Sequence, residues 1–170
     1  MTFIICGLSE VPNVIAARRP SHMITLLDAA SMIETPEAFT PDRHLKLGVN
    51  DIAVPTEGLI PPDEETVLKL LAFGRAWDET APMLVHCWAG ISRSTASAFV
   101  IACDKSPEAD ERAMAITMRK AARHAFPNRR IVALADDILG RRGRMVDAVD
   151  AMGGNEFVNY GVPFDFAARH

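Results

Sequence analysis

The sequence has little of what marks a secreted, membrane or metal-binding protein. It holds only three cysteines, Cys6, Cys87 and Cys103, an odd number without the Cys-x-x-Cys spacing of a zinc site. A disulfide framework is therefore not expected, and free thiols fit a reducing compartment. No stretch approaches the roughly 20 apolar residues of a membrane span, and the apolar run Phe3–Cys6 is too short for a signal peptide core. We predict a cytoplasmic protein that does not enter a membrane.

An excess of positive charge is also absent, because the net charge is −4 over 170 residues. Nucleic acid is therefore not expected as a partner. The basic residues are nevertheless concentrated between positions 119 and 144, where eight Lys or Arg accompany only Asp136 and Asp137. This stretch is either a solvated helical face, as most charge runs are, or a basic rim that attracts a phosphorylated partner. The sequence gives no indication of the oligomeric state.

Hydrophobic patterning predicts a single domain over residues 1–170, in which strands alternate with helices. The predicted strands are Phe3–Cys6, His22–Leu27, Leu45–Val49 and Pro82–His86. The predicted helices lie at 10–19, from 63 to about 77, and at 93–103, 108–125, 129–139 and 141–152. This order indicates an α/β fold, a three-layer-like sandwich with a central, mostly parallel sheet of four to five strands flanked by helices. The tail from Gly153 is expected to pack on the body.

Ligands of such folds bind beyond the carboxyl ends of the strands, which directs attention to the loop after His86. The segment reads His-Cys-Trp-Ala-Gly-Ile-Ser-Arg-Ser over residues 86–94. Successive backbone N–H groups in a tight loop form a nest for an anion, and Gly90 permits the sharp turn. A helix beginning at Arg93 adds positive potential that favours a Cys87 thiolate. The planar fork of Arg93 suits two phosphate oxygens. We therefore expect a phosphate loop between a strand and a helix N-terminus.

This nonapeptide resembles the signature loop of the protein tyrosine phosphatase superfamily, and its Ala-Gly-x-Ser-Arg-Ser ending is closest to the dual-specificity branch. The resemblance is specific over residues 82–100 and loose over 45–140. It implies a protein phosphatase that needs no metal and no cofactor and works through a phosphocysteine formed on Cys87. It also implies that Ser94 helps the thiolate leave and that His86 orders the loop and tunes the cysteine.

The same resemblance implies which residues hold the phosphate: Trp88, Ala89, Gly90, Ile91, Ser92 and Arg93. Trp88 either lines the mouth of the pocket or anchors the loop against the core. The side chains of the loop between Cys87 and Arg93 are uncharged. Phosphoinositide phosphatases of the family often place basic residues there, so phosphorylated Tyr, with Ser or Thr as a further option, is the favoured substrate. The alternatives are a phosphoinositide phosphatase, an inactive module that binds a phosphorylated protein, and thiol-based sulfur or arsenate chemistry.

A family member also needs an Asp upstream that protonates the leaving group. Asp51 follows a predicted strand, opens a proline-containing loop and precedes Cys87 by 36 positions. Asp63 is the rival, although its place after two prolines also suits a helix N-cap. Asn128, in a Pro-Asn pair like that of dual-specificity members, is either near the site or another N-cap. The chain has neither a Trp-Pro-Asp triplet nor any Gln, so it departs from the larger phosphotyrosine-specific enzymes.

Overall fold

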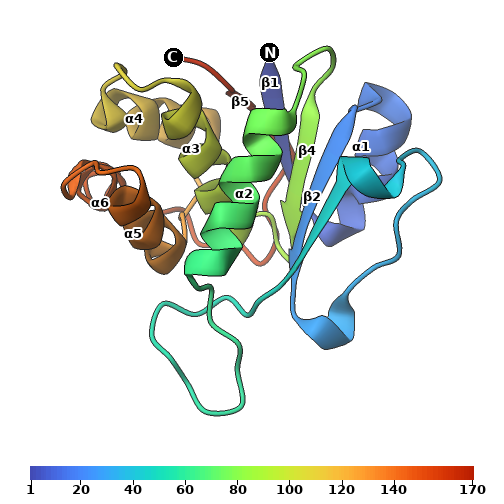
Figure 1. Ribbon diagram of the computed structural model, residues 1–170, viewed down its shortest axis with the longest axis horizontal. Helices are drawn as coiled ribbons and strands as arrows, with labels where there is room; N and C mark the ends of the chain where they lie inside the picture. Colours follow the sequence, from blue (N-terminus) through green and yellow to red (C-terminus); the bar gives the residue numbers. More distant parts are fainter.

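The four predicted strands are present and lie parallel to one another in one sheet. The computed structural model describes residues 1–170 and orders the sheet β3-β2-β4-β1-β5 (Figure 1). The parallel strands are β1 (Thr2–Gly7), β2 (His22–Leu27), β3 (His44–Gly48) and β4 (Met83–Cys87). Every residue of β2 and β4 is buried. Both faces of these strands are covered, which explains their continuous apolar sequences.

The fifth strand comes from the tail, which was expected only to pack on the body. β5 (Phe164–Ala167) pairs antiparallel with β1, and Phe166 in it is almost fully buried. The expectation of a mostly parallel sheet of four to five strands is thus confirmed, with five strands and one antiparallel edge.

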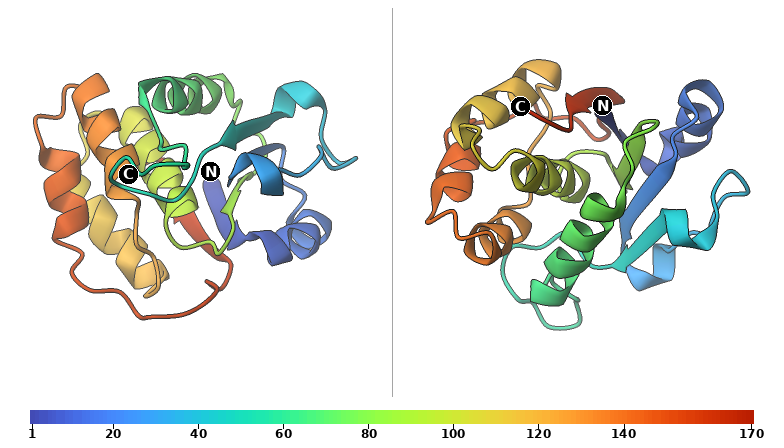
Figure 2. Two further views of the ribbon diagram at one scale, coloured as in Figure 1. Left: turned by 90° about the horizontal axis from the view of Figure 1, so that it is seen from below. Right: turned by 45° about the horizontal axis from the view of Figure 1, so that its top comes forward.

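Six α-helices flank the sheet and complete a three-layer sandwich, as the sequence predicts. The α1 helix (Val11–Arg18) covers one face together with the connection 28–43, and the other five lie on the opposite face (Figures 1 and 2). These five are α2 (Glu64–Ala76), α3 (Arg93–Lys105), α4 (Glu111–Ala121), α5 (Arg129–Ile138) and α6 (Arg144–Asp150). Short 3₁₀ turns occur at Leu8–Glu10, Ala29–Ser31 and Pro41–Arg43. No helix has both the length and the apolar character that a membrane crossing requires.

The two faces of the sheet carry separate apolar cores. Ile5 and Cys87 belong to the larger core, under the five helices, whereas Ile4 and Cys6 belong to the smaller core under α1. Successive side chains of a strand point to opposite faces. His86 pairs in register with Cys6, so it faces the α1 side of the sheet while its neighbour Cys87 faces α3.

Two predicted helices are shorter than the sequence pattern suggests. The predicted helix 108–125 is α4, which begins after Asp110 because that side chain accepts hydrogen bonds from the N–H groups of Arg112 and Ala113. The helix ends at Ala121, and residues 122–128 continue as an irregular segment. The predicted helix 141–152 covers only Arg144–Asp150.

Candidate active site

The loop around Cys87 lies at the carboxyl edge of the sheet, at the end of its central strand. β4 ends at Cys87 and α3 begins at Arg93, so residues 88–92 connect a buried strand to the N-terminus of a buried helix. Neighbouring strands β1 and β2 end at the same edge. This is the position at which the sequence predicts a phosphate loop.

Four of the five carbonyl groups of this loop accept hydrogen bonds from backbone N–H groups outside it. The N–H of Leu8 donates to the carbonyl oxygen of Trp88 at 3.0 Å, and that of Gly161 donates to Ala89 at 2.8 Å. The N–H of Phe126 donates to Ile91 at 2.9 Å, and that of Asn128 donates to Ser92 at 3.2 Å. In a trans peptide the C=O and N–H groups point opposite ways. The outward carbonyls therefore turn the following N–H groups toward the interior of the loop. None of the N–H groups of residues 88–92 donates to a protein acceptor.

Gly90 is the residue that lets the loop approach β1 so closely. It has a φ of +75°, in the left-handed region, and a Cβ on it would lie 2.6 Å from the backbone C of Cys6 and N of Gly7. A Cβ on Gly7 would in turn lie 3.1 Å from the carbonyl carbon of Ala89. The contact at Gly90 requires glycine, whereas a side chain on Gly7 would force the loop to shift by a few tenths of an ångström. The sequence analysis singled out Gly90 but missed Gly7, whose only signal is its place at the end of a buried strand.

Cys87 and Ser94 face each other across the start of α3. The Sγ of Cys87 lies 3.2 Å from the Oγ of Ser94, and both residues are buried. The other two thiols are different in character, because burial raises the pKa of Cys6 and that of Cys103 to about 12. They stay protonated near neutral pH, in agreement with the expectation that they are core residues.

Arg93 is buried beneath the same loop with its guanidinium only partly paired. The residue is 6% exposed, and its Nη1 donates to the carbonyl oxygen of Val49 at 2.8 Å. Its Nε is buried and has no hydrogen-bond partner in the protein. A buried, unpaired donor on a charged group is costly, so it marks a position where an anion would be stabilised.

Asp51 lies at the loop, held by two donors. Its Oδ1 accepts hydrogen bonds from Ser92 Oγ at 2.7 Å and from Asn128 Nδ2 at 2.8 Å, and Oδ2 makes none. The residue is exposed, in the long excursion between β3 and α2 (Figure 1). Asn128 at the same time caps α5, because its Oδ1 accepts from Arg130 N and Ile131 N at 3.1 Å. Both interpretations of Asn128 therefore hold together.

Asp63 has the structure of a helix cap. Its Oδ1 accepts hydrogen bonds from Thr66 N at 2.8 Å and Thr66 Oγ1 at 2.6 Å, which completes a capping box at the start of α2. These hydrogen bonds from Thr66 lower the pKa of the Asp63 carboxyl. A general acid must hold its proton near neutral pH, so this environment does not suit Asp63 for that role.

His86 lies behind Cys87, on the other face of the sheet. Its Nε2 is 2.7 Å from Thr25 Oγ1, and its Nδ1 is 3.4 Å from the carbonyl oxygen of Cys87. The side chain is fully buried, and this burial lowers its pKa to about 4. The ring is therefore neutral near pH 7 and bonds to the backbone carbonyl of Cys87.

Three exposed aromatic residues lie in the loop or next to its backbone contacts. Trp88 is 48% exposed, as the mouth interpretation requires and the anchoring interpretation does not. Phe126 is also exposed, and its own N–H binds the loop carbonyl of Ile91. Tyr160, the only tyrosine of the chain, is exposed beside the N–H of Gly161 that binds Ala89. The sequence analysis did not predict Phe126 or Tyr160 here, since they come from distant segments.

Half of the cations in the basic stretch 119–144 are paired within the protein. Four of its eight cations form ion pairs: Arg123 with Glu156, Arg129 with Asp150, and Arg141 and Arg144 with Glu111. The Nε of Arg130 donates to the carbonyl oxygen of Pro62. These contacts favour a structural role over a basic rim.

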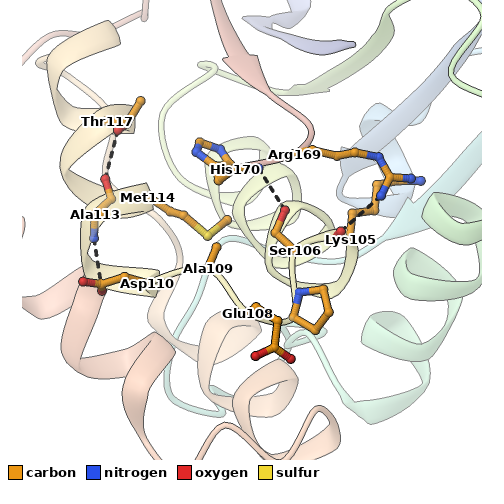
Figure 3. A pocket seen from close by; sticks show the side chains of 11 residues that line it. Lys105, Ser106, Glu108, Ala109, Asp110, Ala113, Met114, Thr117, Arg169 and His170 are labelled. Carbon is orange, nitrogen blue, oxygen red and sulfur yellow. Dashed lines mark hydrogen bonds between the residues drawn. The ribbon is translucent and has the colours of Figure 1, made fainter.

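A hollow of about 540 Å³ lies elsewhere, between the end of α3, the start of α4 and the chain's C-terminal residues (Figure 3). Within it the backbone N–H of His170 donates to Ser106 Oγ at 3.0 Å. Its cations Lys105 and Arg169 both pair with Glu79. None of the residues around Cys87 lines this hollow, so it is separate from the candidate site.

Comparison with known proteins adds no relative. No family model matches the chain, and no curated protein matches it. The structure also brings together no group of three or more His, Cys, Asp or Glu side chains that could hold a metal ion.

Proposed function

We propose that this protein hydrolyses phosphate monoesters, foremost phosphotyrosine in proteins, through a phosphocysteine intermediate on Cys87. The observation that carries the proposal is the loop itself. The N–H groups of residues 88–92 have no protein acceptor, and the outward carbonyls turn those of residues 89, 90 and 92 toward the interior of the loop that follows the buried Cys87. The Nε of Arg93 is also buried without a partner. This set of donors suits the oxygens of a phosphoryl group, whose charge they would stabilise in the transition state.

In the first step the Cys87 thiolate attacks phosphorus, and the bond from phosphorus to the leaving oxygen breaks. Asp51 gives its proton to that oxygen, so the product leaves as a neutral alcohol or phenol. The placement of Asp51 supports this role, because Ser92 and Asn128 hold Oδ1 and leave Oδ2 free. Arg93 and the loop N–H groups bind the three remaining oxygens of the phosphoryl group.

In the second step water attacks the phosphocysteine, and the Asp51 carboxylate accepts the proton that the water loses. The phosphorus–sulfur bond breaks and inorganic phosphate is released, which restores the Cys87 thiolate. Ser94 Oγ, at 3.2 Å from Sγ, is in position to donate a hydrogen bond to the departing sulfur. The cycle consumes one water and needs a reduced Cys87, for which a cytoplasmic location is suitable.

The rim of the site favours an aryl phosphate on a protein. Trp88 and Phe126 present exposed aromatic surface beside a loop with uncharged side chains. Such surface packs on a phenyl ring and offers no ion pair to a phosphoinositide headgroup. The substrate assignment is therefore tested by comparing the rates at which the protein hydrolyses a phosphotyrosine peptide and a soluble phosphoinositide at equal concentration. A faster rate on the phosphoinositide would contradict the substrate assignment while leaving the chemistry intact.

The chemistry is tested by hydrolysis of p-nitrophenyl phosphate in EDTA. We expect turnover by the unaltered protein and its loss in Cys87→Ser, which should still bind the unreactive oxyanion tungstate when EDTA is left out. Cys103→Ala, the matched control, should turn over normally. Equal turnover in Cys87→Ser would remove Cys87 as the nucleophile. Tungstate binding without turnover by the unaltered protein would instead indicate a module that binds phosphorylated proteins.

A further inference from the structure

A row of polar side chains runs across the α1-facing side of the sheet and ends at the backbone of Cys87. This side is opposite to the one that the Cys87 side chain faces. Thr35 Oγ1 lies 2.9 Å from His44 Nδ1, and His44 Nε2 lies 2.7 Å from Thr25 Oγ1. Thr25 Oγ1 is also 2.7 Å from His86 Nε2, and His86 Nδ1 lies 3.4 Å from the carbonyl oxygen of Cys87. Three neighbouring strands, β3, β2 and β4, thus contribute one side chain each.

The partners allow only one direction for these hydrogen bonds. A carbonyl oxygen can only accept, so His86 carries its proton on Nδ1, and its Nε2 must accept from the Thr25 hydroxyl. The Thr25 oxygen then accepts from His44 Nε2–H, which leaves Nδ1 of His44 to accept from the Thr35 hydroxyl. Every proton of the row points toward Cys87. Aligned hydrogen bonds of this kind polarise and strengthen one another.

The row stays uncharged near neutral pH. Burial lowers the pKa of His44 and that of His86 to about 4, and the cations Lys46 and Arg93 lower them further. Cys6, beside His86 on β1, has a thiol whose pKa burial raises to about 12. No carboxylate acts on either ring. Both imidazoles are therefore neutral, as the single proton arrangement requires.

We propose that Thr25, His44 and Thr35 are positioning residues, which act through His86 to fix the first peptide group of the Cys87 loop. The Cys87 carbonyl and the Trp88 N–H belong to one peptide unit and point opposite ways. Holding the carbonyl on the α1 side aims the Trp88 N–H into the loop, and polarising the carbonyl makes that N–H a stronger donor to a thiolate. The catalytic consequence rests on the proposed function, whereas the effect on the Cys87 thiol does not.

The proton arrangement is tested directly by long-range ¹H–¹⁵N NMR of the five histidine rings in the unaltered protein. We expect His86 as the Nδ1–H tautomer and His44 as the Nε2–H tautomer at pH 7. The reverse assignment for either ring, or a charged ring at pH 7, would overturn the proposal.

The effect on the site is tested by the pH dependence of Cys87 alkylation with iodoacetamide, followed by mass spectrometry of the Cys87 peptide. Thr25→Val removes the central hydroxyl and should raise the midpoint by about 0.5 unit or more, roughly a threefold loss of thiolate below it. Thr25→Ser keeps the hydroxyl and should restore the unaltered midpoint. Thr35→Val changes the half-buried outer end of the row. It should raise the alkylation midpoint of Cys87 by less than Thr25→Val does. Thr2→Val makes the same chemical change at the N-terminal end of β1 and should leave the alkylation midpoint of Cys87 unaltered.

The outcomes separate this proposal from the proposed function. A shift in Thr25→Val that Thr25→Ser reverses supports the positioning role, even if no phosphate ester is hydrolysed. Equal midpoints in Thr25→Val, Thr35→Val and the unaltered protein would refute it, even if phosphatase activity is found. An equal shift in Thr25→Ser and Thr25→Val would also refute it, because packing instead of the hydroxyl would then be the cause. If Thr25→Val does not fold, the midpoint of Thr35→Val decides.

Discussion

Replacing Asp51 by Asn isolates the proton that the proposed mechanism assigns to this residue. The change keeps the size of the side chain and one carbonyl oxygen. That oxygen can still accept the hydrogen bonds that Ser92 Oγ and Asn128 Nδ2 now give to Oδ1. The 50–62 excursion should therefore keep its place, and only the acid is lost. Any change in rate then reports proton transfer and not a displaced loop.

The size of the loss depends on the leaving group. A positioned general acid contributes about 10²–10⁴-fold to the rate, which corresponds to roughly 3–5 kcal/mol of activation free energy. A leaving group as basic as an alkyl alcohol needs the whole of that help. p-Nitrophenolate leaves readily without a proton, so Asp51→Asn should lower its kcat far less. We expect a dependence on leaving-group pKa that is steep in the variant and shallow in the unaltered protein.

The assay is single-turnover and steady-state hydrolysis of aryl phosphates that span a range of leaving-group pKa values. Asp63→Asn is the matched control, because it makes the same chemical change at a helix cap, where Asn serves nearly as well as Asp. It should leave kcat unchanged for every substrate. A near-normal rate of Asp51→Asn on the most basic leaving group, with a loss in Asp63→Asn, would show that the acid had been assigned to the wrong residue.

Three further changes test other parts of the structure. Arg93→Lys keeps the charge but loses the planar fork, so we expect kcat/KM for p-nitrophenyl phosphate to fall about 10²–10³-fold, and a loss under tenfold would contradict the two-oxygen role. Burial holds the pKa of His44 and that of His86 at about 4, below the 6.5 of the unfolded chain. Between pH 4 and pH 6.5 the unfolded state therefore binds more protons than the folded state. The free energy of unfolding is greatest above pH 6.5 and declines as the pH falls toward 4. Equal urea midpoints at pH 7 and pH 4.5 would refute this. Arg141→Ala removes one partner of the buried ion pair with Glu111 and should lower the free energy of unfolding by about 3 kcal/mol. Urea titration measures this loss, and kcat should stay unchanged.

The parts of the fold that the sequence predicted well are those set by local patterns. Strands β1, β2, β3 and β4 and the turn into α3 follow from apolar runs and from one short motif. Their bounds differ from the predicted ones by one residue at most. The predicted helix 108–125 was too long, because residues 122–128 leave the helix to reach the loop, where Phe126 and Asn128 donate to its carbonyls. The four-residue strand β5 follows a Gly-rich segment and carries too little pattern to be recognised.

The site was predictable in its chemistry but not in its supports. Cys87, Arg93 and Ser94 lie within eight residues, so their spacing alone indicates their neighbourhood. The residues that support the loop come from distant positions in the sequence. Gly161 binds a loop carbonyl, and Thr25 contacts His86 on the opposite face of the sheet. Such contacts arise from strand order and from the path of the irregular segments. A single sequence does not encode these in any local pattern.

The anchoring of the Cys87 loop also has a consequence for when activity can arise during synthesis. One of its four carbonyl anchors is the N–H of residue 161, and the strand that follows, 164–167, closes the edge of β1. A nascent chain that has exposed only the cysteine motif therefore carries Cys87 in an incompletely held loop. Segments up to about residue 167 must leave the ribosome before the loop is fixed. The loop around Cys87 therefore takes its final form late, after most of the domain has folded around it.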